Sequence, residues 1–145
     1  RASAWAHSKN TGSLSRVSAC NGVFERSRRM QALLESGASK VVVVLTTAPT
    51  AEVAERVGET LVGEGLAACA NILPGVRSIF QWKGAVAHEA EVLVILKTTA
   101  QRLAALSRRV AELHPYEVPE VIALDVVGGH EPYLDWVRSE VGRAS

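Results

Sequence analysis

The chain has 145 residues, of which 48% are hydrophobic and 21% charged, and its formal net charge is +1. These values predict a single soluble, globular domain and exclude the fibrous and the largely disordered classes of protein. Residues 1–40 hold seven Lys or Arg against two Glu, whereas residues 41–145 hold nine against thirteen acidic residues. Because the folded part is mildly acidic, we expect no nucleic-acid partner. No apolar run approaches the roughly 20 residues that span a bilayer, so we expect no membrane insertion.

Residues 1–39 differ in composition from the rest: they are rich in Ser, Ala and Arg and contain no aspartate. The pattern at 24–34 predicts a short amphipathic helix with several arginines, which is typical of organellar transit peptides. We therefore expect a chloroplast or mitochondrial targeting segment; the alternative is a disordered tail on a cytoplasmic protein. Residues 40–145 are expected to form the folded domain. Cys20 and Cys69 lie in these unlike segments, so we expect no disulfide and a reducing compartment.

The folded domain begins with a strand and a helix. Residues 41–45 are a continuous Val and Leu run, typical of a strand buried on both faces. Thr50 suits the N-cap of the helix that follows, and Gly65 suits a left-handed conformation just beyond its end. Two strands are then expected, at 68–82 and 85–97, joined by the tight turn Lys83-Gly84.

The second half of the domain repeats this order. Leucines and valines at helical spacing predict a helix from Thr99 that ends at His114-Pro115. A strand is expected at 121–127 and a closing helix at 132–141, with Pro132 in its first turn. The order βαββαβ with a C-terminal helix predicts an α+β, ferredoxin-like fold, in which two helices cover one face of an antiparallel sheet.

The two long central strands need cover from outside their own domain. The run at 68–82 would extend about 50 Å at 3.3 Å per residue, further than a compact domain of about 105 residues measures. Pro74-Gly75 is expected to bend or bulge the first of these strands. The arm still presents Val76, Ile79, Phe80 and Trp82. Since exposed apolar edges recruit partners, we expect an obligate homo-oligomer.

Several short motifs occur in the order and spacing of one known family. They are Thr-Thr-Ala-Pro at 46–49, Leu-Ala-Ala-Cys-Ala-Asn-Ile-Leu-Pro-Gly at 66–75, Trp-Lys-Gly at 82–84, Leu-Lys-Thr at 96–98, His-Pro-Tyr-Glu-Val-Pro-Glu at 114–120 and Tyr-Leu-Asp-Trp at 133–136. On these motifs the chain resembles the CutA family of divalent-cation tolerance proteins. The resemblance implies a ferredoxin-like homotrimer, similar to the PII signalling proteins, associated with tolerance of copper and other divalent metals. It implies no enzymatic activity.

The copper site of bacterial members of that family offers a test of single residues. It has been assigned to a cysteine after the first strand and two adjacent histidines before Pro-Tyr. Thr46 stands at the cysteine position and Leu113 at the first histidine position, so only His114 matches. A lone imidazole binds weakly, and Cu(II) prefers several nitrogen or oxygen ligands, for which Glu117 or Glu120 are candidates. We expect weak binding of Cu(II) or another divalent metal, and no obligatory cofactor.

Two candidate metal ligands also have structural interpretations. His114 ends a helix, where a cationic ring would stabilise the last carbonyl groups. Cys69 lies between alanines on an expected buried strand and is predicted to behave as a small core residue, with thiolate ligation as the alternative.

Five further residues are expected at an interface between subunits or in a cleft there. The indoles are suited to subunit contacts, where one edge packs and the N–H finds a partner. The polar side chains of Lys97, Tyr116 and Glu120 lie beside apolar strands, and we expect them to pair with one another and with Glu91. These residues are Trp82, Lys97, Tyr116, Glu120 and Trp136.

The sequence thus predicts a non-catalytic, homotrimeric metal-binding protein of the CutA type. The alternative is a PII-like regulatory trimer that binds a small anionic metabolite in clefts between subunits. RNA-binding domains of the same strand order stack bases on aromatic residues, which 92–96 lacks. A small acylphosphatase-like hydrolase needs an arginine after the first strand, and 46–49 has none. No catalytic residues are assigned.

Overall fold

A computed structural model of the protein describes residues 40–142. The predicted transit peptide, its helix and Cys20 lie outside these residues. Within residues 40–142, four strands and three helices follow one another in the expected βαββαβ order with a helix at the end. The strands are β1 (Val41–Ala48), β2 (Cys69–Trp82), β3 (Ala85–Thr99) and β4 (Ile122–Asp125). The helices are α2 (Ala51–Gly63), α3 (Leu103–Leu113) and α4 (Glu131–Glu140).

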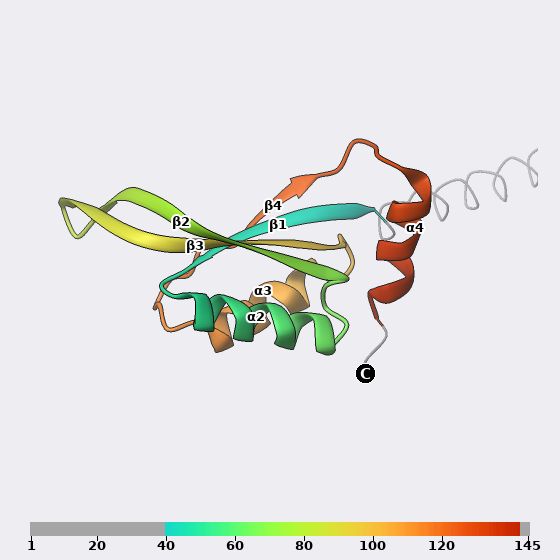
Figure 1. The fold of residues 1–145 in the computed structure, drawn as a ribbon, viewed down its shortest axis with the longest axis horizontal. Helices are drawn as coiled ribbons and strands as arrows, with labels where there is room; N and C mark the ends of the chain where they lie inside the picture. Colours follow the sequence, from blue (N-terminus) through green and yellow to red (C-terminus); the bar gives the residue numbers. More distant parts are fainter. Residues whose placement is uncertain (1–39, 143–145) are drawn as a thin grey trace, which may run out of the picture. The chain divides into compact units, whose positions relative to one another are not determined.

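The strands form one antiparallel sheet in the order β2-β3-β1-β4, and α2 and α3 lie together on one of its faces (Figure 1). Alternate residues of the central strands point towards these helices, as the two-residue period of a strand requires. Val44, Val94 and Leu96 from the sheet and Leu61 and Leu106 from the helices are fully buried in the resulting core. The predicted ferredoxin-like fold is confirmed.

Both predicted ends of α2 are confirmed. The Thr50 hydroxyl accepts a hydrogen bond of 3.3 Å from the N–H of Val53, as an N-cap side chain does. At the other end Gly65 has a φ of +65°, which is a left-handed conformation that glycine adopts at little cost. The N–H groups of Gly65 and Leu66 donate back to the carbonyls of Val62 and Leu61, so the helix ends in a Schellman motif.

The long hairpin of β2 and β3 also has the predicted turn and bulge. Lys83 and Gly84 both have positive φ, of 48° and 83°, as a two-residue type I′ turn requires. The pairing register shifts between Leu73 and Val76, where Gly75 has a φ of +87°. Beyond this bulge the hairpin projects past the two helices (Figure 1). Its Ile79 is 67% exposed in the single chain, so the arm is not enclosed within its own subunit.

The predicted boundary between the third strand and the second helix is wrong. Thr98 and Thr99 belong to β3, and α3 begins only at Leu103. The two threonines pair with Val42 and Val41, and the Thr98 hydroxyl donates to the carbonyl of Leu66 at 2.6 Å. Pairing with β1 therefore outweighs the capping preference of threonine.

The predicted fourth strand, 121–127, is too long. β4 spans Ile122–Asp125 because it pairs only with residues 42–45 of β1. A salt bridge of 2.7 Å between Lys40 and Asp125 lies beside the last of these pairs.

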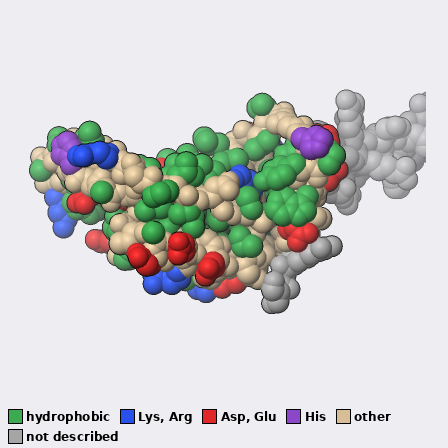
Figure 2. Space-filling view, viewed as in Figure 1, with side chains coloured by type: hydrophobic (Ala, Val, Ile, Leu, Met, Phe, Trp, Pro, Cys, Tyr) green, Lys and Arg blue, Asp and Glu red, His purple; other side chains and the backbone are tan. Residues whose placement is uncertain are grey.

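The sheet face opposite α2 and α3 is named here the open face. Val43, Leu45 and Ile95 lie on it and are only half-buried, although they occupy the two central strands. Figure 2 shows hydrophobic side chains gathered across the middle of the molecule, above the charged side chains of the helical layer. Helix α4 covers a different part: its Leu134 and Val137 pack with Val41 and Ala68 in a small second core.

Candidate functional site

His114 occupies the C-cap of α3 and holds the loop that follows, residues 114–121, against β1. Its ring is 8% exposed, and Nε2 lies 2.7 Å from the carbonyl oxygen of Thr47. Nδ1 accepts a hydrogen bond of 3.1 Å from the N–H of Tyr116. Nδ1 accepts only when it carries no proton, so this geometry fits the neutral ring with its proton on Nε2. The ring therefore bonds to two backbone groups and positions Tyr116.

The two candidate metal ligands are not brought together by the fold. Cys69 pairs with Lys97 of β3, whereas Thr47, the partner of His114, pairs with Leu93. Four residues of a strand correspond to about 13 Å. Within residues 40–142 no group of three or more His, Cys, Asp or Glu side chains could hold a metal ion. Both nitrogens of His114 are engaged, so a metal ion would have to displace one of these bonds.

Cys69 differs from its expected surroundings, and Thr46 is buried. Cys69 is half-buried rather than enclosed in the core, and its Sγ lies 3.7 Å from the hydroxyl of Tyr133. That hydrogen bond, followed by burial, raises the pKa of Tyr133. Thr46, at the position of the bacterial cysteine, faces the core, and its buried hydroxyl makes no hydrogen bond in the described structure.

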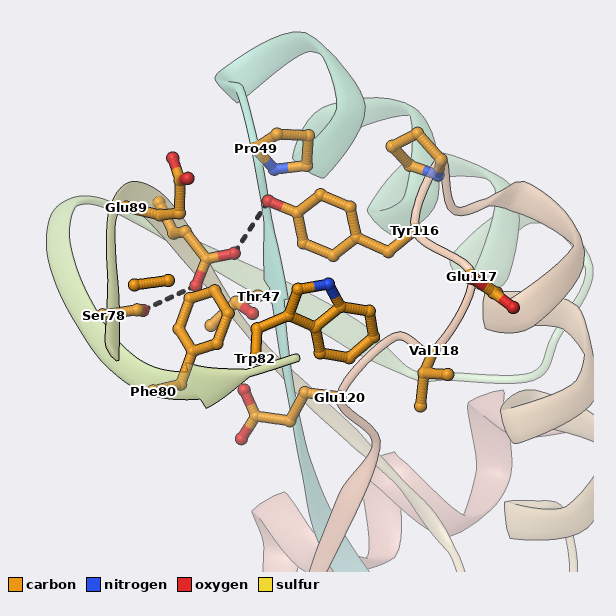
Figure 3. Close-up of a pocket in the computed structure, with 13 residues that line it drawn as sticks. Thr47, Pro49, Ser78, Phe80, Trp82, Glu89, Tyr116, Glu117, Val118 and Glu120 are labelled. Carbon is orange, nitrogen blue, oxygen red and sulfur yellow. Dashed lines mark hydrogen bonds between the residues drawn. The ribbon is translucent and has the colours of Figure 1, made fainter. Parts of the chain in front are cut away.

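A pocket of about 760 Å³ lies where the hairpin, the end of β1 and the loop after α3 meet (Figure 3). The hairpin supplies Phe80 and Trp82, and the loop supplies Tyr116 and Val118 to the same space. Its other lining residues are Thr47, Pro49, Ser78, Ala87, Glu89, Glu91, Pro115, Glu117 and Glu120. Aromatic and aliphatic surface with a few polar groups is typical of small-molecule sites.

Tyr116 and Glu91 connect the two sides of this pocket. The Tyr116 hydroxyl donates a hydrogen bond of 2.9 Å to Oε1 of Glu91, and the Ser78 hydroxyl donates one of 2.5 Å to Oε2. Glu91 is 7% exposed and lines the pocket. Burial, together with the hydrogen bond to Glu91 and its charge, raises the pKa of Tyr116 to about 12. The phenol therefore remains a donor throughout the physiological pH range.

The charge of the pocket is entirely negative. Glu89, Glu91, Glu117 and Glu120 line it, and no Lys, Arg or His among the described residues does so. In Figure 3 the Glu117 carboxylate points away from the cavity, whereas Glu120 lies below Trp82 and Phe80.

Of the five predicted interface or cleft residues, Trp82, Tyr116 and Glu120 line this pocket and two do not. Lys97 donates a hydrogen bond to the side-chain amide of Asn71, on the open face. Trp136 lies on α4, where its ring centroid is 5.5 Å from that of Tyr133. The expected pairing between polar groups is thus observed for Tyr116 and Glu91, but within the described residues not for Lys97 or Glu120. Glu89 and Ser78 were missed, although a register counted back from the Lys83-Gly84 turn places them opposite each other.

Comparison with known proteins identifies the family. The family model described as "CutA1 divalent ion tolerance protein" matches residues 42–140, which is most of the chain. The chain belongs to the CutA1 family. Known members of the family contain the same fold, so the resemblance seen in the sequence motifs is confirmed.

Comparison with individual CutA proteins supports the same family. The divalent-cation tolerance protein CutA of Thermus thermophilus is 48% identical over 100 residues, covering 69% of this chain and 97% of that protein. Rice (Oryza sativa) Protein CutA 1, chloroplastic, is 42% identical over 120 residues, covering 81% of this chain and 68% of that protein. The crystal structure of CutA1 from rice superposes with a TM-score of 0.70 at 42% identity, covering 73% of this chain and 96% of the other. The Thermus CutA1 structure superposes with a TM-score of 0.69 at 47% identity, covering 70% of this chain and 99% of the other.

None of the helices in residues 40–142 is long and apolar enough to cross a membrane.

Proposed function

We propose that this CutA protein is a non-catalytic homotrimer that acts in tolerance of divalent cations and binds them weakly. The assembly is inferred from the apolar surface that a single chain leaves exposed. Ile79 and Val86 on the hairpin and Leu124 on β4 are exposed, and the open face of the sheet is only half-covered. Burying one such side chain contributes about 1.5–3 kcal/mol, so a few of them per subunit favour a stable interface. The threefold arrangement is what resemblance to CutA implies.

Weak, exchangeable metal binding is the form that fits the residues. Among residues 40–142 no preformed cluster of ligands is available, and His114 gains a free nitrogen only by losing its bond to Thr47 or to Tyr116. Cys69 offers a thiol elsewhere in the sheet, without a second soft ligand beside it. Cu(II) or another divalent ion is therefore proposed as a ligand rather than as a resident cofactor. The name of the Thermus relative, divalent-cation tolerance protein, supports this relation to metals.

The absence of catalysis is part of the same proposal. The ring of His114 bonds to two backbone groups, and within residues 40–142 it bonds to no serine or cysteine that it could activate. The carboxylate of Glu91 is held by two hydroxyl groups that are donors to it.

The assembly is tested by measuring the native mass of the full chain. A mass of three chains supports the proposal, and a monomer at micromolar concentration contradicts it. The metal part is tested by titrating Cu(II) while following the His114 ring by NMR, with His130, an exposed histidine outside the pocket, as internal reference. Perturbation of His114 before His130 supports ligation. An unchanged His114 ring at millimolar copper would rule that ligand out.

The alternative, a PII-like trimer that binds a small anionic metabolite, has the volume of the pocket in its favour. About 760 Å³ lies within the range of about 300–1,000 Å³ for small-molecule sites. The negative charge of the pocket opposes the binding of an anion, because Glu89, Glu91 and Glu120 line it and no described Lys, Arg or His does. A thermal-shift screen of nucleotides and organic acids tests this alternative, which a flat response would dismiss.

An organellar location is proposed from the composition of residues 1–39 and supported by the chloroplastic relatives of rice and Arabidopsis thaliana. Fusion of residues 1–40 to a fluorescent reporter tests it. Import into chloroplasts or mitochondria is expected, and a diffuse cytoplasmic signal would contradict the proposal.

A further inference from the structure

We propose that Lys97 of each subunit forms an ion pair with the partner subunit's Glu91, in the pocket between the hairpin and the loop after α3. The pocket of a single chain is then one half of a contact, and a second copy of the chain supplies the other half. This inference rests on the trimer proposed above, and it adds the two side chains through which neighbouring subunits recognise each other.

Glu91 and Lys97 carry opposite charges and have only neutral hydrogen-bond partners in the single chain. Glu91 is 7% exposed, and its carboxylate accepts from the hydroxyl groups of Ser78 and Tyr116. Lys97 is half-buried and donates to the side-chain amide of Asn71. Neither forms an ion pair with another described residue. Buried charges are normally paired, because removing a charge from water is costly.

A single chain cannot bring these two side chains together. Both belong to β3, and their separation of six residues places them on the same face of the strand, about 20 Å apart. Lys97 lies opposite Val43 on the open face, whereas Glu91 lies opposite Val76, just beyond the bulge. Direct contact between the two charges therefore needs a second copy of the chain.

The proposed assembly makes a counter-charge necessary at both places. Lys97 has the apolar Val43 and Ile95 as neighbours on the open face, and Glu91 shares its pocket with Phe80 and Trp82. Covering these apolar surfaces with another subunit excludes water from the two charges as well. In such surroundings an unpaired charge is costly, and the attraction between opposite charges is stronger than in water.

Threefold symmetry arranges the charges as this pairing requires. In a closed ring of three copies, each contact joins one patch of a subunit to a different patch of the next subunit. The open face contributes the cation of Lys97. The pocket contributes the anionic patch, because Glu89, Glu91 and Glu120 line it and no described Lys, Arg or His does. One head-to-tail contact, repeated three times, pairs every Lys97 with a Glu91.

The test exchanges the two charges in the full chain. Lys97→Glu and Glu91→Lys, each alone, should raise the protein concentration at which the trimer dissociates by about tenfold or more, because like charges would meet in the interface. The double variant should recover most of this loss, since the pair forms again with its signs exchanged. Rescue within one chain is excluded by the separation of about 20 Å along β3.

Native mass over a dilution series measures these effects, after circular dichroism has verified that each variant folds. Arg108→Glu, a reversal of charge on the exposed side of α3, is the matched control and should leave dissociation unchanged. Glu91→Lys also removes the acceptor of the Ser78 and Tyr116 hydroxyl groups. A crystal structure of the unsubstituted trimer is therefore the second measurement, with Nζ of Lys97 expected within about 4 Å of a carboxylate oxygen of the partner subunit's Glu91.

Two results would overturn the inference while leaving the trimer intact. The first is a Lys97→Glu variant that dissociates at the same concentration as the unsubstituted trimer. The second is a crystal structure of the trimer in which Lys97 contacts no carboxylate of the partner subunit's pocket. An unsubstituted chain that is monomeric at micromolar concentration would instead contradict the trimer, and this inference with it.

Discussion

The hydroxyl of Tyr116 donates a hydrogen bond of 2.9 Å to the buried carboxylate of Glu91 and so joins the loop after α3 to the β2-β3 hairpin. His114 prepares this contact, since its Nδ1 accepts the N–H of Tyr116 and its ring lies 4.7 Å from the tyrosine ring. Tyr116 is therefore fixed at two points, its backbone N–H by His114 and its hydroxyl by Glu91, and these bonds position it in the pocket.

Tyr116→Phe should destabilise the fold by about 1.5–3 kcal/mol, the range for a hydrogen bond to a charged group, because Glu91 would keep only Ser78 as a donor. Urea denaturation at fixed protein concentration measures this change. Tyr133→Phe is the matched control, because that hydroxyl lies on the surface and has only the 3.7 Å contact with Cys69. Equal effects of the two substitutions would contradict the importance assigned to the Glu91 contact.

Alkaline pH should break the same contact at a predictable point. An unfolded tyrosine has a pKa of about 10, whereas burial and Glu91 raise the pKa of Tyr116 to about 12. A pKa that is higher in the folded state stabilises the fold while the group is protonated. The stabilisation is therefore complete below about pH 10 and is lost as the pH rises to about 12.

Ultraviolet titration of the phenolates checks this. The chain has two tyrosines, and the pKa of Tyr133 is also raised, first by its hydrogen bond with Cys69. Tyr133→Phe should leave one phenol that ionises near pH 12, and Tyr116→Phe should leave one that ionises earlier. The reverse order would be inconsistent with the buried position of Tyr116.

Local signals in the sequence predicted the fold well where one residue decides the conformation. The conformation at Thr50, at Gly65 and at the Lys83-Gly84 turn depends only on residues close by in the sequence. The structure has the predicted conformation at each of them. The predicted bounds were wrong where pairing between segments distant in the sequence decides the secondary structure. Thr98 and Thr99 have capping preferences, yet the ladder to β1 keeps them in a strand.

The pocket could be predicted only in part, for the same reason. Tyr116 and Glu120 stand in one motif of the sequence, whereas Glu91 and Trp82 reach them through the register of a bulged hairpin. Its negative charge combines Glu89 and Glu91 of β3 with Glu117 and Glu120 of the loop after α3. Lys97 was expected to pair there, but it lies six residues from Glu91 along β3, which is about 20 Å, and its ammonium group donates to Asn71 instead.

Gly58 marks a close approach between α2 and β2. A Cβ added at Gly58 would lie 3.0 Å from the Cβ of Ala70, tighter than ordinary packing. Gly58→Ala should therefore destabilise the protein by about 1–3 kcal/mol through overpacking, although alanine favours helices. Gly63→Ala in the last turn, where a Cβ meets nothing within 4 Å, should stabilise it by about 0.5–1 kcal/mol. Thermal unfolding at one protein concentration measures both, and a gain for Gly58→Ala would show that the helix can shift freely.

Thr46 and Thr98 form a matched pair of buried hydroxyl groups with opposite expected effects. Both are almost completely buried on neighbouring strands, but Thr98 donates to the carbonyl of Leu66 at 2.6 Å, whereas Thr46 has no partner in the described structure. A buried hydroxyl without a hydrogen bond costs about 1–3 kcal/mol, so Thr46→Val should stabilise the protein by about 1 kcal/mol. Thr98→Val should destabilise it by about 1–2 kcal/mol, because the Leu66 carbonyl would lose its donor. Guanidinium denaturation compares the two midpoints. Destabilisation by Thr46→Val as large as that by Thr98→Val would mean that the Thr46 hydroxyl has a bonding partner in solution, such as a bound water.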